Sequence, residues 1–213
     1  MGLTSVVSPV LEIAATGAAI PSGVYDAVLV SSAKGVECAG ADAGRYKSLP
    51  MHVVGAKTAR AAEVQGWRTD IVAGNAEAIL PLLLARYPEP AHFLYLAGRD
   101  RQAALEAGLG GAGHSVTAVN VYEAQAAQAL SDDASAALGA GEIDFALHYS
   151  RRSVELFLNL AESAGLSDAL PGIVHIALSS DVAAPLEARG LDVARAEKPD
   201  EDHLLTTLAH SVS

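Results

Sequence analysis

The chain has 213 residues, 51% of them apolar, so it can fold as one large domain or as two domains of about 100 residues each. Its formal net charge of −11 and its aromatic content of 5% argue against a nucleic-acid partner, which requires basic and stacking side chains. Cys38 is the only cysteine, which excludes an internal disulfide and favours a reducing cytoplasm. No apolar run reaches the roughly 20 residues that span a bilayer and the N-terminus does not read as a signal peptide, so we expect no membrane partner.

Short apolar runs of strand type alternate with helical runs rich in Ala and Leu, a pattern that predicts βα units and a parallel sheet. The predicted strands are Ala27–Val30, Met51–Val54, Thr69–Val72, His92–Leu96, Ser115–Val121, Ile143–His148, Ile173–Leu178 and Asp192–Arg195. The predicted helices are Lys34–Ala41, Thr58–Gln65, Ala76–Arg86, Arg101–Ala107, Ser153–Ala164, Asp181–Ala188 and Glu201–His210. We expect helices to end at Gly66, Gly108 and Gly190.

The two halves of the chain resemble each other at an offset of about 120 residues. The strand and helix start in Ala27-Val-Leu-Val-Ser-Ser-Ala-Lys-Gly-Val36 have a counterpart in Phe145-Ala-Leu-His-Tyr-Ser-Arg-Arg-Ser-Val154. Leu49-Pro50 and Leu170-Pro171 each lead into a strand, a helix, a glycine and another strand. This order predicts two related α/β domains, and the alternative is that all βα units look alike.

The segment Gly108-x-Gly110-x-x-Gly113 matches the dinucleotide-binding fingerprint as text. In that motif the glycines follow a strand and open a helix, so that the pyrophosphate meets a helix N-terminus. Here a helix precedes the glycines and a strand follows, which favours a helix end and a loop. The seven histidines are scattered, with no ligand pair on one helix, so we expect neither a metal nor a cofactor.

Most other polar residues of interest lie where predicted strands pass into helices, at the carboxyl edge of a parallel sheet, where ligands bind. In the first half these junctions hold Ser31, Ser32, Lys34, Gly55, Thr58, Gly74, Asn75, Gly98, Arg99 and Arg101. In the second half they hold Ser150, Arg151, Arg152, Ser179 and Ser180. Helix N-termini attract anions, so such an edge suits a polycarboxylate. The alternative for each Ser, Thr and Asn is that it only caps a helix.

A series of motifs runs along nearly the whole chain. The pieces are Val28-Leu-Val-Ser-Ser-Ala-Lys-Gly-Val36, Val53-Val-Gly-Ala-Lys-Thr-Ala59 with Gly66, Ala73-Gly-Asn-Ala-Glu77, Tyr95-Leu-Ala-Gly-Arg99, Val121-Tyr122, Ile143-Asp144 leading to Tyr149-Ser150, and Ala194 to Leu205. In order and spacing the series resembles the uroporphyrinogen-III synthase family, although no single piece is specific.

The resemblance implies an α/β fold of two similar, flavodoxin-like domains with parallel sheets, joined by two extended linkers, with the ligand cleft between them. On this chain residues 9–121 would form one domain, and residues 1–8 with 122–213 the other. The implied activity is that of a cofactor-free, cytoplasmic lyase of haem biosynthesis, which we expect to be a monomer. It closes hydroxymethylbilane, a linear tetrapyrrole with eight carboxylates, into uroporphyrinogen III while inverting ring D.

In the reaction that the resemblance implies, the terminal hydroxyl of hydroxymethylbilane leaves as water and gives an azafulvene cation. A spiro intermediate then fragments and recloses. Confinement of the substrate carries most of the catalysis, with acid assistance to the departing hydroxyl. Tyr122 matches the family's tyrosine at the interdomain crossing and is the candidate acid, since a phenol is protonated at neutral pH. The alternative is that Tyr122 is a structural hinge residue.

The resemblance places Ser32, Thr58 and Ser150 at hydroxyl positions that face the cleft. The remaining expected substrate-binding residues are Lys34, Asn75, Gly98, Arg99, Ser179 and Ser180. All of them belong to the strand-to-helix junctions, so the resemblance and the anion argument point to the same edge.

The chain departs from the family pattern at two places. Residues Gly2 to Pro9 read as the family's second strand and a linker, so a preceding strand and helix of the second domain are expected to be missing. Leu178-Ser-Ser-Asp-Val182 replaces a junction rich in Gly and Thr, and Asp181 brings a negative charge to it. Two other functions stay open. Two α/β domains with two crossings also describe a hinged, two-domain protein that binds small anions, and the shortened start is also typical of a degenerate synthase paralogue without activity.

Overall fold

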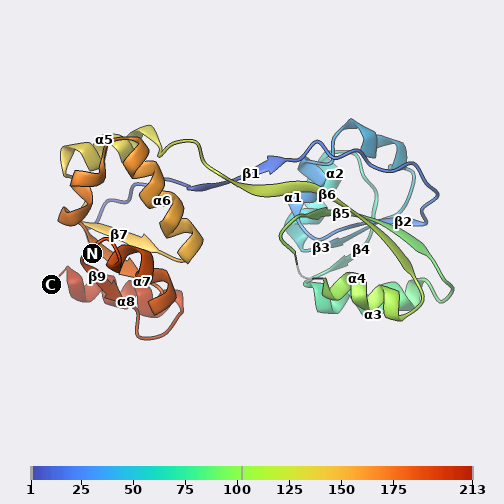
Figure 1. Ribbon diagram of the computed structural model, residues 1–213. Helices are drawn as coiled ribbons and strands as arrows, with labels where there is room; N and C mark the ends of the chain where they lie inside the picture. Colours follow the sequence, from blue (N-terminus) through green and yellow to red (C-terminus); the bar gives the residue numbers. More distant parts are fainter. Residues whose placement is uncertain (1, 102, 213) are drawn as a thin grey trace. The chain divides into compact units, whose positions relative to one another are not determined.

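The computed structural model describes residues 2–101 and 103–212, and it divides into two compact units (Figure 1). Unit 2 comprises Ile13–Gln125, and unit 1 comprises Met1–Glu12 together with Ala126–Ser213. The chain therefore passes between the units twice, a few residues after each boundary that the sequence suggested. Both units combine parallel-paired strands with helices, so the fold is mixed α/β.

Unit 2 is built on a six-stranded sheet of order β1-β6-β5-β2-β3-β4. The strands are β1 (Leu11–Ala15), β2 (Ala27–Val30), β3 (Met51–Val54), β4 (Thr69–Ala73), β5 (His92–Gly98) and β6 (Ser115–Ala126). All neighbours from β6 to β4 pair in parallel. β1 runs antiparallel to β6, because the Thr16 amide donates to the Val121 carbonyl and the Ala127 amide to the Val10 carbonyl.

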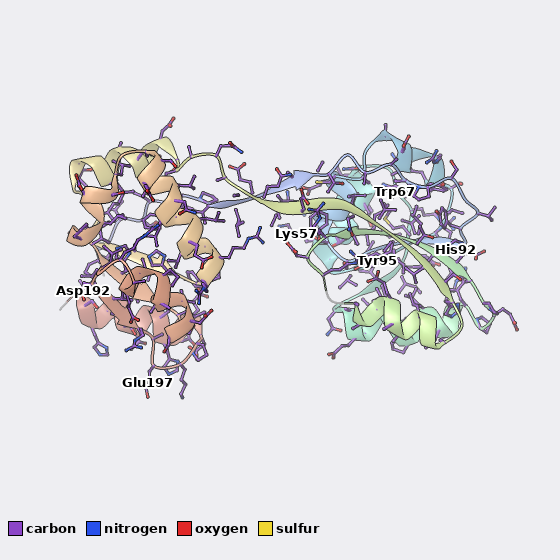
Figure 2. The ribbon with its side chains drawn as sticks, in the orientation of Figure 1. Lys57, Trp67, His92, Tyr95, Asp192 and Glu197 are labelled. Carbon is purple, nitrogen blue, oxygen red and sulfur yellow. The ribbon has the colours of Figure 1, made fainter. Side chains whose placement is uncertain are left out.

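Both faces of this sheet are covered, because successive strand residues point to opposite sides. Val28 and Val30 pack with α1 (Ala33–Glu37) and α2 (Ala56–Val64), and we call this side the α1/α2 face. Ala27 and Leu29 pack on the other side with α3 (Ala76–Arg86) and α4 (Ala104–Gly111), and we call it the α3/α4 face. Figure 2 labels Trp67 from the first core cluster and Tyr95 from the second.

The helix predicted at Lys34–Ala41 is shorter than expected and ends at Glu37. Gly40 has a left-handed φ of 70°, which a continuing α-helix does not allow. A 3-10 helix, η1 (Ala41–Tyr46), follows it.

The expectation that Gly108 ends a helix is wrong. The helix begins at Ala104 and continues to Gly111, and Gly113 takes the positive φ, at 89°. Gly108 is a contact point instead, because a Cβ there would lie 2.5 Å from the Leu80 side chain of α3. The glycine therefore allows α4 to pack closely on α3.

Unit 1 contains a three-stranded parallel sheet of order β7-β8-β9. Its strands are β7 (Phe145–His148), β8 (Val174–Ala177) and β9 (Val193–Arg195). Its helices are α5 (Asp132–Ala140), α6 (Arg151–Ser163), α7 (Ser180–Glu187) and α8 (Glu201–Ser211), with a 3-10 helix, η2 (Ser167–Gly172). Leu158 and Leu186 belong to a core cluster of α5, α6 and α7, and Leu204 and Leu208 of α8 pack with Ile176 in another.

The internal similarity corresponds to a repeated order of elements. In unit 2 the order is β2-α1-η1-β3-α2-β4-α3, and in unit 1 it is β7-α6-η2-β8-α7-β9-α8. In both, the three strands are neighbours in sequence order. β2 also has β5 on its other side, whereas β7 is an edge strand among the residues that the structure describes.

Three parts of unit 1 and its crossings differ from the sequence analysis. α5 and β1 were not predicted, and residues 2–9, expected to begin as a strand, form none. The side chain of Ser8 accepts a hydrogen bond from the Ser131 amide at 2.9 Å, and the Ser131 hydroxyl donates to the Val7 carbonyl. The segment is thus bound to the start of α5 rather than to a sheet.

No helix among the described residues is both long and apolar enough to cross a membrane.

Candidate functional site

The carboxyl edge of the unit 2 sheet is the first place where the predicted site residues lie. Ser32 caps α1 by accepting from the Lys34 amide at 3.3 Å, and Asn75 caps α3 by accepting from the Ala78 amide at 2.8 Å. Capping, the simpler interpretation for these residues, is therefore present. It occupies acceptor atoms and leaves the Ser32 hydroxyl proton and the Asn75 amide group as possible donors to an anion.

Two other predicted residues of this edge are less available than expected. Thr58 is only 4% exposed, so its hydroxyl lies inside the unit. Lys34 is exposed, but its ammonium group lies 2.6 Å from the Glu37 carboxylate. The hydrogen bond to Glu37 raises the pKa of Lys34 and shares its charge.

Lys57 was not among the predicted site residues, although it belongs to the motif that contains Thr58. It is exposed in the first turn of α2 (Figure 2), and within the described part of the chain its side chain has no hydrogen bond or ion pair. The positive end of the helix dipole disfavours a cation in the first turn. An anion bound there would be attracted by the dipole and would also offset the charge of Lys57. The signal that could have found Lys57 is this unfavourable position.

Gly98 ends β5, and Arg99 begins the loop that follows it. The guanidinium of Arg99 forms an ion pair with Glu123 of β6 and is still 62% exposed. Glu123 also accepts a hydrogen bond from Gln125 at 2.8 Å. One Glu123 oxygen is buried and makes no well-directed hydrogen bond among the described residues, so the Arg99 pair is its main compensation.

Tyr122 lies beside Gly98 because the register between β5 and β6 shifts. Ala97 is opposite Asn120, but Gly98 is opposite Tyr122, so β6 has one extra residue, a β-bulge. Regular alternation would put Tyr122 on the side opposite Val121, yet both pack against the core of the α1/α2 face. Its ring occupies the place of a Gly98 side chain, because a Cβ there would lie 2.6 Å from the ring.

The hydroxyl of Tyr122 differs from those of the other tyrosines in its hydrogen bonding. The chain has six tyrosines, and five of them hydrogen-bond through their hydroxyls to protein groups: Tyr25, Tyr46, Tyr87, Tyr95 and Tyr149. Among the described residues the Tyr122 hydroxyl has no such partner. The hydroxyl of a buried tyrosine usually finds a partner in the protein, whereas that of the half-buried Tyr122 is accessible to solvent or to a ligand.

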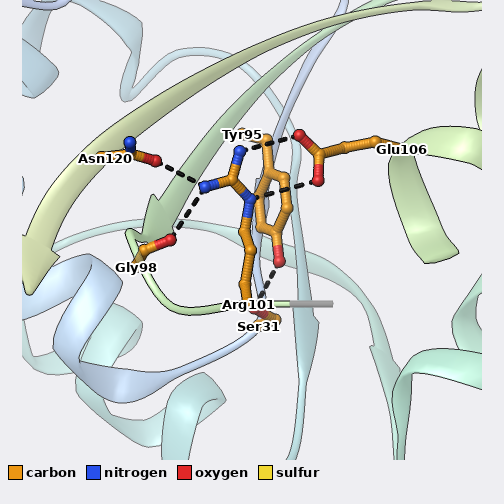
Figure 3. Close-up of polar contacts among 6 residues, drawn as sticks. All are labelled: Ser31, Tyr95, Gly98, Arg101, Glu106 and Asn120. Atoms are coloured by element: carbon orange, nitrogen blue, oxygen red, sulfur yellow. Dashed lines mark hydrogen bonds and ion pairs between the residues drawn. The ribbon is translucent and has the colours of Figure 1, made fainter. Parts of the chain in front are cut away.

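A cluster of polar side chains near the ends of β2 and β5 was not predicted from the sequence (Figure 3). The buried hydroxyl of Tyr95 lies 2.6 Å from the Ser31 hydroxyl at the end of β2, and burial raises the pKa of Tyr95. Arg101 lies over the Tyr95 ring and makes a two-point contact with Glu106, at 2.8 and 3.1 Å. Tyr95 lies in an apolar run, where the sequence pattern does not distinguish a tyrosine with a bonded hydroxyl from an ordinary core side chain.

The carboxyl edge of unit 1 holds the second set of predicted residues. Ser150 caps α6 by accepting from the Ser153 amide at 3.1 Å, and Ser179 caps α7 by accepting from the Val182 amide at 3.4 Å. Ser180 accepts from Arg195 at 3.4 Å. The charge of Asp181, which seemed unfavourable here, is compensated by Arg151 at 3.1 Å.

Histidines do not form a metal site in either unit. Within residues 2–101 and 103–212, no group of three or more His, Cys, Asp and Glu side chains is placed to hold a metal ion. His148 and His175 are buried neighbours, with a ring nitrogen of each 3.0 Å apart. His175 also donates to the Leu170 carbonyl at 3.3 Å, so the pair is part of the core of unit 1.

Comparisons with known proteins give one family. A sequence model of the family described as uroporphyrinogen-III synthase HemD matches residues 1–206. The crystal structure of uroporphyrinogen-III synthetase from Helicobacter pylori is similar, with a TM-score of 0.56 and 19% identity, over 96% of this chain and 91% of that one. The wild-type uroporphyrinogen III synthase from Thermus thermophilus gives a TM-score of 0.41 at 20% identity, over 89% and 80% of the chains. No curated protein sequence matches the chain.

Proposed function

The chain belongs to the uroporphyrinogen-III synthase family, whose activity is that of a lyase in haem biosynthesis, and we propose that its substrate binds the carboxyl edges described above. The reaction is closure of hydroxymethylbilane to uroporphyrinogen III with inversion of ring D and loss of water. It involves no net change of oxidation state, so it requires no redox cofactor. The observation that carries the proposal is the hydroxyl of Tyr122, which has no hydrogen-bond partner in the described part of the chain and lies at an edge rich in donors.

Substrate carboxylates would be bound by groups that the fold leaves available. In unit 2 these are Lys57, the exposed guanidinium of Arg99, and the N-termini of α2 and α3 next to Gly55 and Asn75. Backbone amides of a helix start and a nearby cation both favour an anion. The net charge of −11 makes such local donors necessary.

The substrate would also contact unit 1, through Ser150, Ser179 and Ser180 at the starts of α6 and α7. We therefore propose a synthase of two flavodoxin-like domains joined by two linkers, with the domain boundary near Tyr122. The ligand would be held by both domains. The repeated order of elements in the two units supports it, because equivalent edges then carry equivalent helix N-termini. We further propose that the protein acts as a monomer. Its single cysteine favours a reducing compartment, and we propose the cytoplasm.

Tyr122 would assist the first step by donating a hydrogen bond or a proton to the departing hydroxyl. Water leaves, and the resulting cation is attacked by the substituted carbon of the last ring, giving the spiro intermediate. Fragmentation and reclosure then produce the inverted ring. Binding the carboxylates holds the two ends of the tetrapyrrole together, which supplies most of the rate and excludes closure without inversion.

The purified chain, given hydroxymethylbilane, should produce the type III isomer faster than spontaneous closure. Isomers are separated after oxidation to the porphyrins. Formation of only the type I isomer at the spontaneous rate would remove the enzyme assignment for this chain and favour a binding protein or an inactive paralogue.

A further inference from the structure

Arg101 is held by more hydrogen bonds than any other cation of this edge that the structure describes (Figure 3). Its Nη1 donates to the Gly98 carbonyl at 2.9 Å and to Asn120 Oδ1 at 2.5 Å. Its Nε and Nη2 donate to the two Glu106 oxygens at 3.1 and 2.8 Å. Four of the five N–H groups of a guanidinium are thus used within the protein, which leaves Arg101 poorly suited to bind a substrate carboxylate.

The partners of Arg101 surround the β-bulge. Gly98 is the β5 residue at which the register shifts, and Asn120 is the last β6 residue before the shift. Asn120 is also held from the other side, because the Thr16 hydroxyl donates to its carbonyl at 2.6 Å. Arg101 therefore connects β5, β6 and the start of α4 at the point where the bulge forms.

The bulge decides which side of the sheet receives Tyr122. With the extra residue in place, the ring lies on Gly98 and packs toward the α1/α2 face. Ser32 and Lys34 lie at the start of α1 on that side, and Lys57 lies in the first turn of α2. A regular register would turn the ring toward the α3/α4 face, away from those groups.

We propose that Arg101, fixed by Glu106, is a positioning residue that holds the bulge and thereby keeps the Tyr122 ring on the α1/α2 face. The inference rests on the proposed function for its catalytic consequence, but the placement of the ring has its own measurement. Arg101 acts through Gly98 and Asn120 and does not touch the substrate.

The placement is tested by nitrating the full chain with tetranitromethane and quantifying each tyrosine by peptide mass spectrometry. Arg101→Lys cannot make the planar two-point contact with Glu106, so the half-buried Tyr122 should become severalfold more reactive. Tyr149, exposed in unit 1, is the internal control, and Arg86→Lys, which changes an exposed pair with Asp70, is the matched variant. Unchanged reactivity of Tyr122 in Arg101→Lys would overturn the inference.

Glu106→Gln is the second variant, in case Arg101→Lys does not fold. It keeps Arg101 and weakens only the ion pair that fixes it, so Tyr122 should again become more reactive than in the parent, by less. Equal reactivity in the folded Glu106→Gln protein counts against the inference, whatever happens to the lysine variant.

The catalytic consequence is tested by a double-mutant cycle of Arg101→Lys and Tyr122→Phe, in which single-turnover rates are measured at excess enzyme. Arg101→Lys should lower this rate by roughly 10²-fold, as a misplaced catalytic group does, and let type I product appear. Adding Tyr122→Phe should then cost little more, because both changes remove the same contribution. Multiplying effects would show that Arg101 acts independently of Tyr122 and would reject the inference. A parent that makes only type I product rejects the proposed function, while the nitration result still decides the positioning role.

Discussion

At the scale of single residues, the hydroxyl of Tyr122 is the sharpest test of chemistry. Tyr122→Phe removes one oxygen that has no partner among the described residues and keeps the ring on Gly98. If the phenol assists the departing hydroxyl, turnover should fall by about 10² to 10⁴, the range for general acid catalysis, while the melting temperature hardly moves.

Turnover and melting temperature of the phenylalanine variant are measured on the same preparation, with Tyr25→Phe as a control whose hydroxyl bonds the Pro21 carbonyl. That control should lose stability and keep its turnover. Turnover of Tyr122→Phe within a few fold of the parent would leave Tyr122 as a wall or hinge residue and give the acid role to water or to a substrate carboxyl.

Lys57 and Lys34 differ in whether their charge is already shared. Lys57→Ala should raise KM strongly, because a lost charge-assisted contact is worth roughly 1.5–3 kcal/mol. Lys34→Ala should raise it less, since Glu37 competes for the ammonium at 2.6 Å. Lys47, which donates to the Gln65 carbonyl, gives a neutral control variant, Lys47→Ala. Steady-state kinetics at fixed salt would contradict the ranking if Lys34 had the larger effect.

Glu123 competes with a substrate carboxylate for the guanidinium of Arg99, which is paired with Glu123 and still 62% exposed. In Glu123→Gln the guanidinium of Arg99 no longer faces a negative charge, so substrate should bind more tightly and KM should fall. Arg99→Ala should do the opposite. The comparison is read from KM at low ionic strength, where the competition is least screened. A higher KM in Glu123→Gln would mean that Glu123 orients Arg99 for the substrate.

At the scale of elements, three strands carry buried neutral histidines: His52 in β3, His148 in β7 and His175 in β8. Burial lowers the pKa of His52 to about 4 and that of His148 to about 3, and burial also lowers the pKa of His175. Below the ordinary histidine value of about 6.5 the unfolded chain therefore binds protons that the folded chain does not. Stability should be fully present above that pH and should fall as the pH decreases.

Urea midpoints measured at pH 7.5, 6 and 5 check this expectation. In this pH range most carboxylates stay ionised, so a change in stability reports mainly on the histidines. Each such histidine removes up to about 1.4 kcal/mol per pH unit below its unfolded value. His148→Gln should make the decrease shallower, because it removes one of the three groups. An unchanged midpoint between pH 7.5 and about 5 would show that the histidines are protonated in the folded protein.

At the scale of the whole molecule, the two units differ in how the chain builds them. Unit 2 is one continuous segment whose sheet is covered on both faces, whereas unit 1 joins an N-terminal piece to the C-terminal part. An excised fragment of residues 11–127 should therefore unfold cooperatively in urea, followed by circular dichroism. The matched fragment 128–213 lacks the Ser8 and Val7 contacts to Ser131 and should be less stable. A non-cooperative transition in the first fragment would contradict this prediction.

The elements with strong local signals were predicted well from the sequence. β2, β3 and α3 have the predicted bounds, because their apolar runs and the cap at Asn75 are local properties. α5 was missed although it has local signals, the Ser131 cap at its start and the left-handed Gly141 at its end, because with only Ala134 and Leu138 buried its apolar pattern is weak. Gly108 was misread because its role depends on Leu80, 28 positions earlier in the chain.

For function, the sequence by itself determined the family, the α/β fold class and the strand-to-helix junctions, since the order of motifs and local periodicity need no neighbours in space. Only the tertiary structure decided which junction side chains are available: Thr58 is buried, Lys34 is paired, Arg99 is paired but still 62% exposed, and Lys57 has no partner among the described residues. It also decided the side on which Tyr122 lies, because a register shift of one residue between two strands cannot be read from either strand alone. Burial and pairing depend on residues far apart in the sequence, so they appear only once the chain has folded.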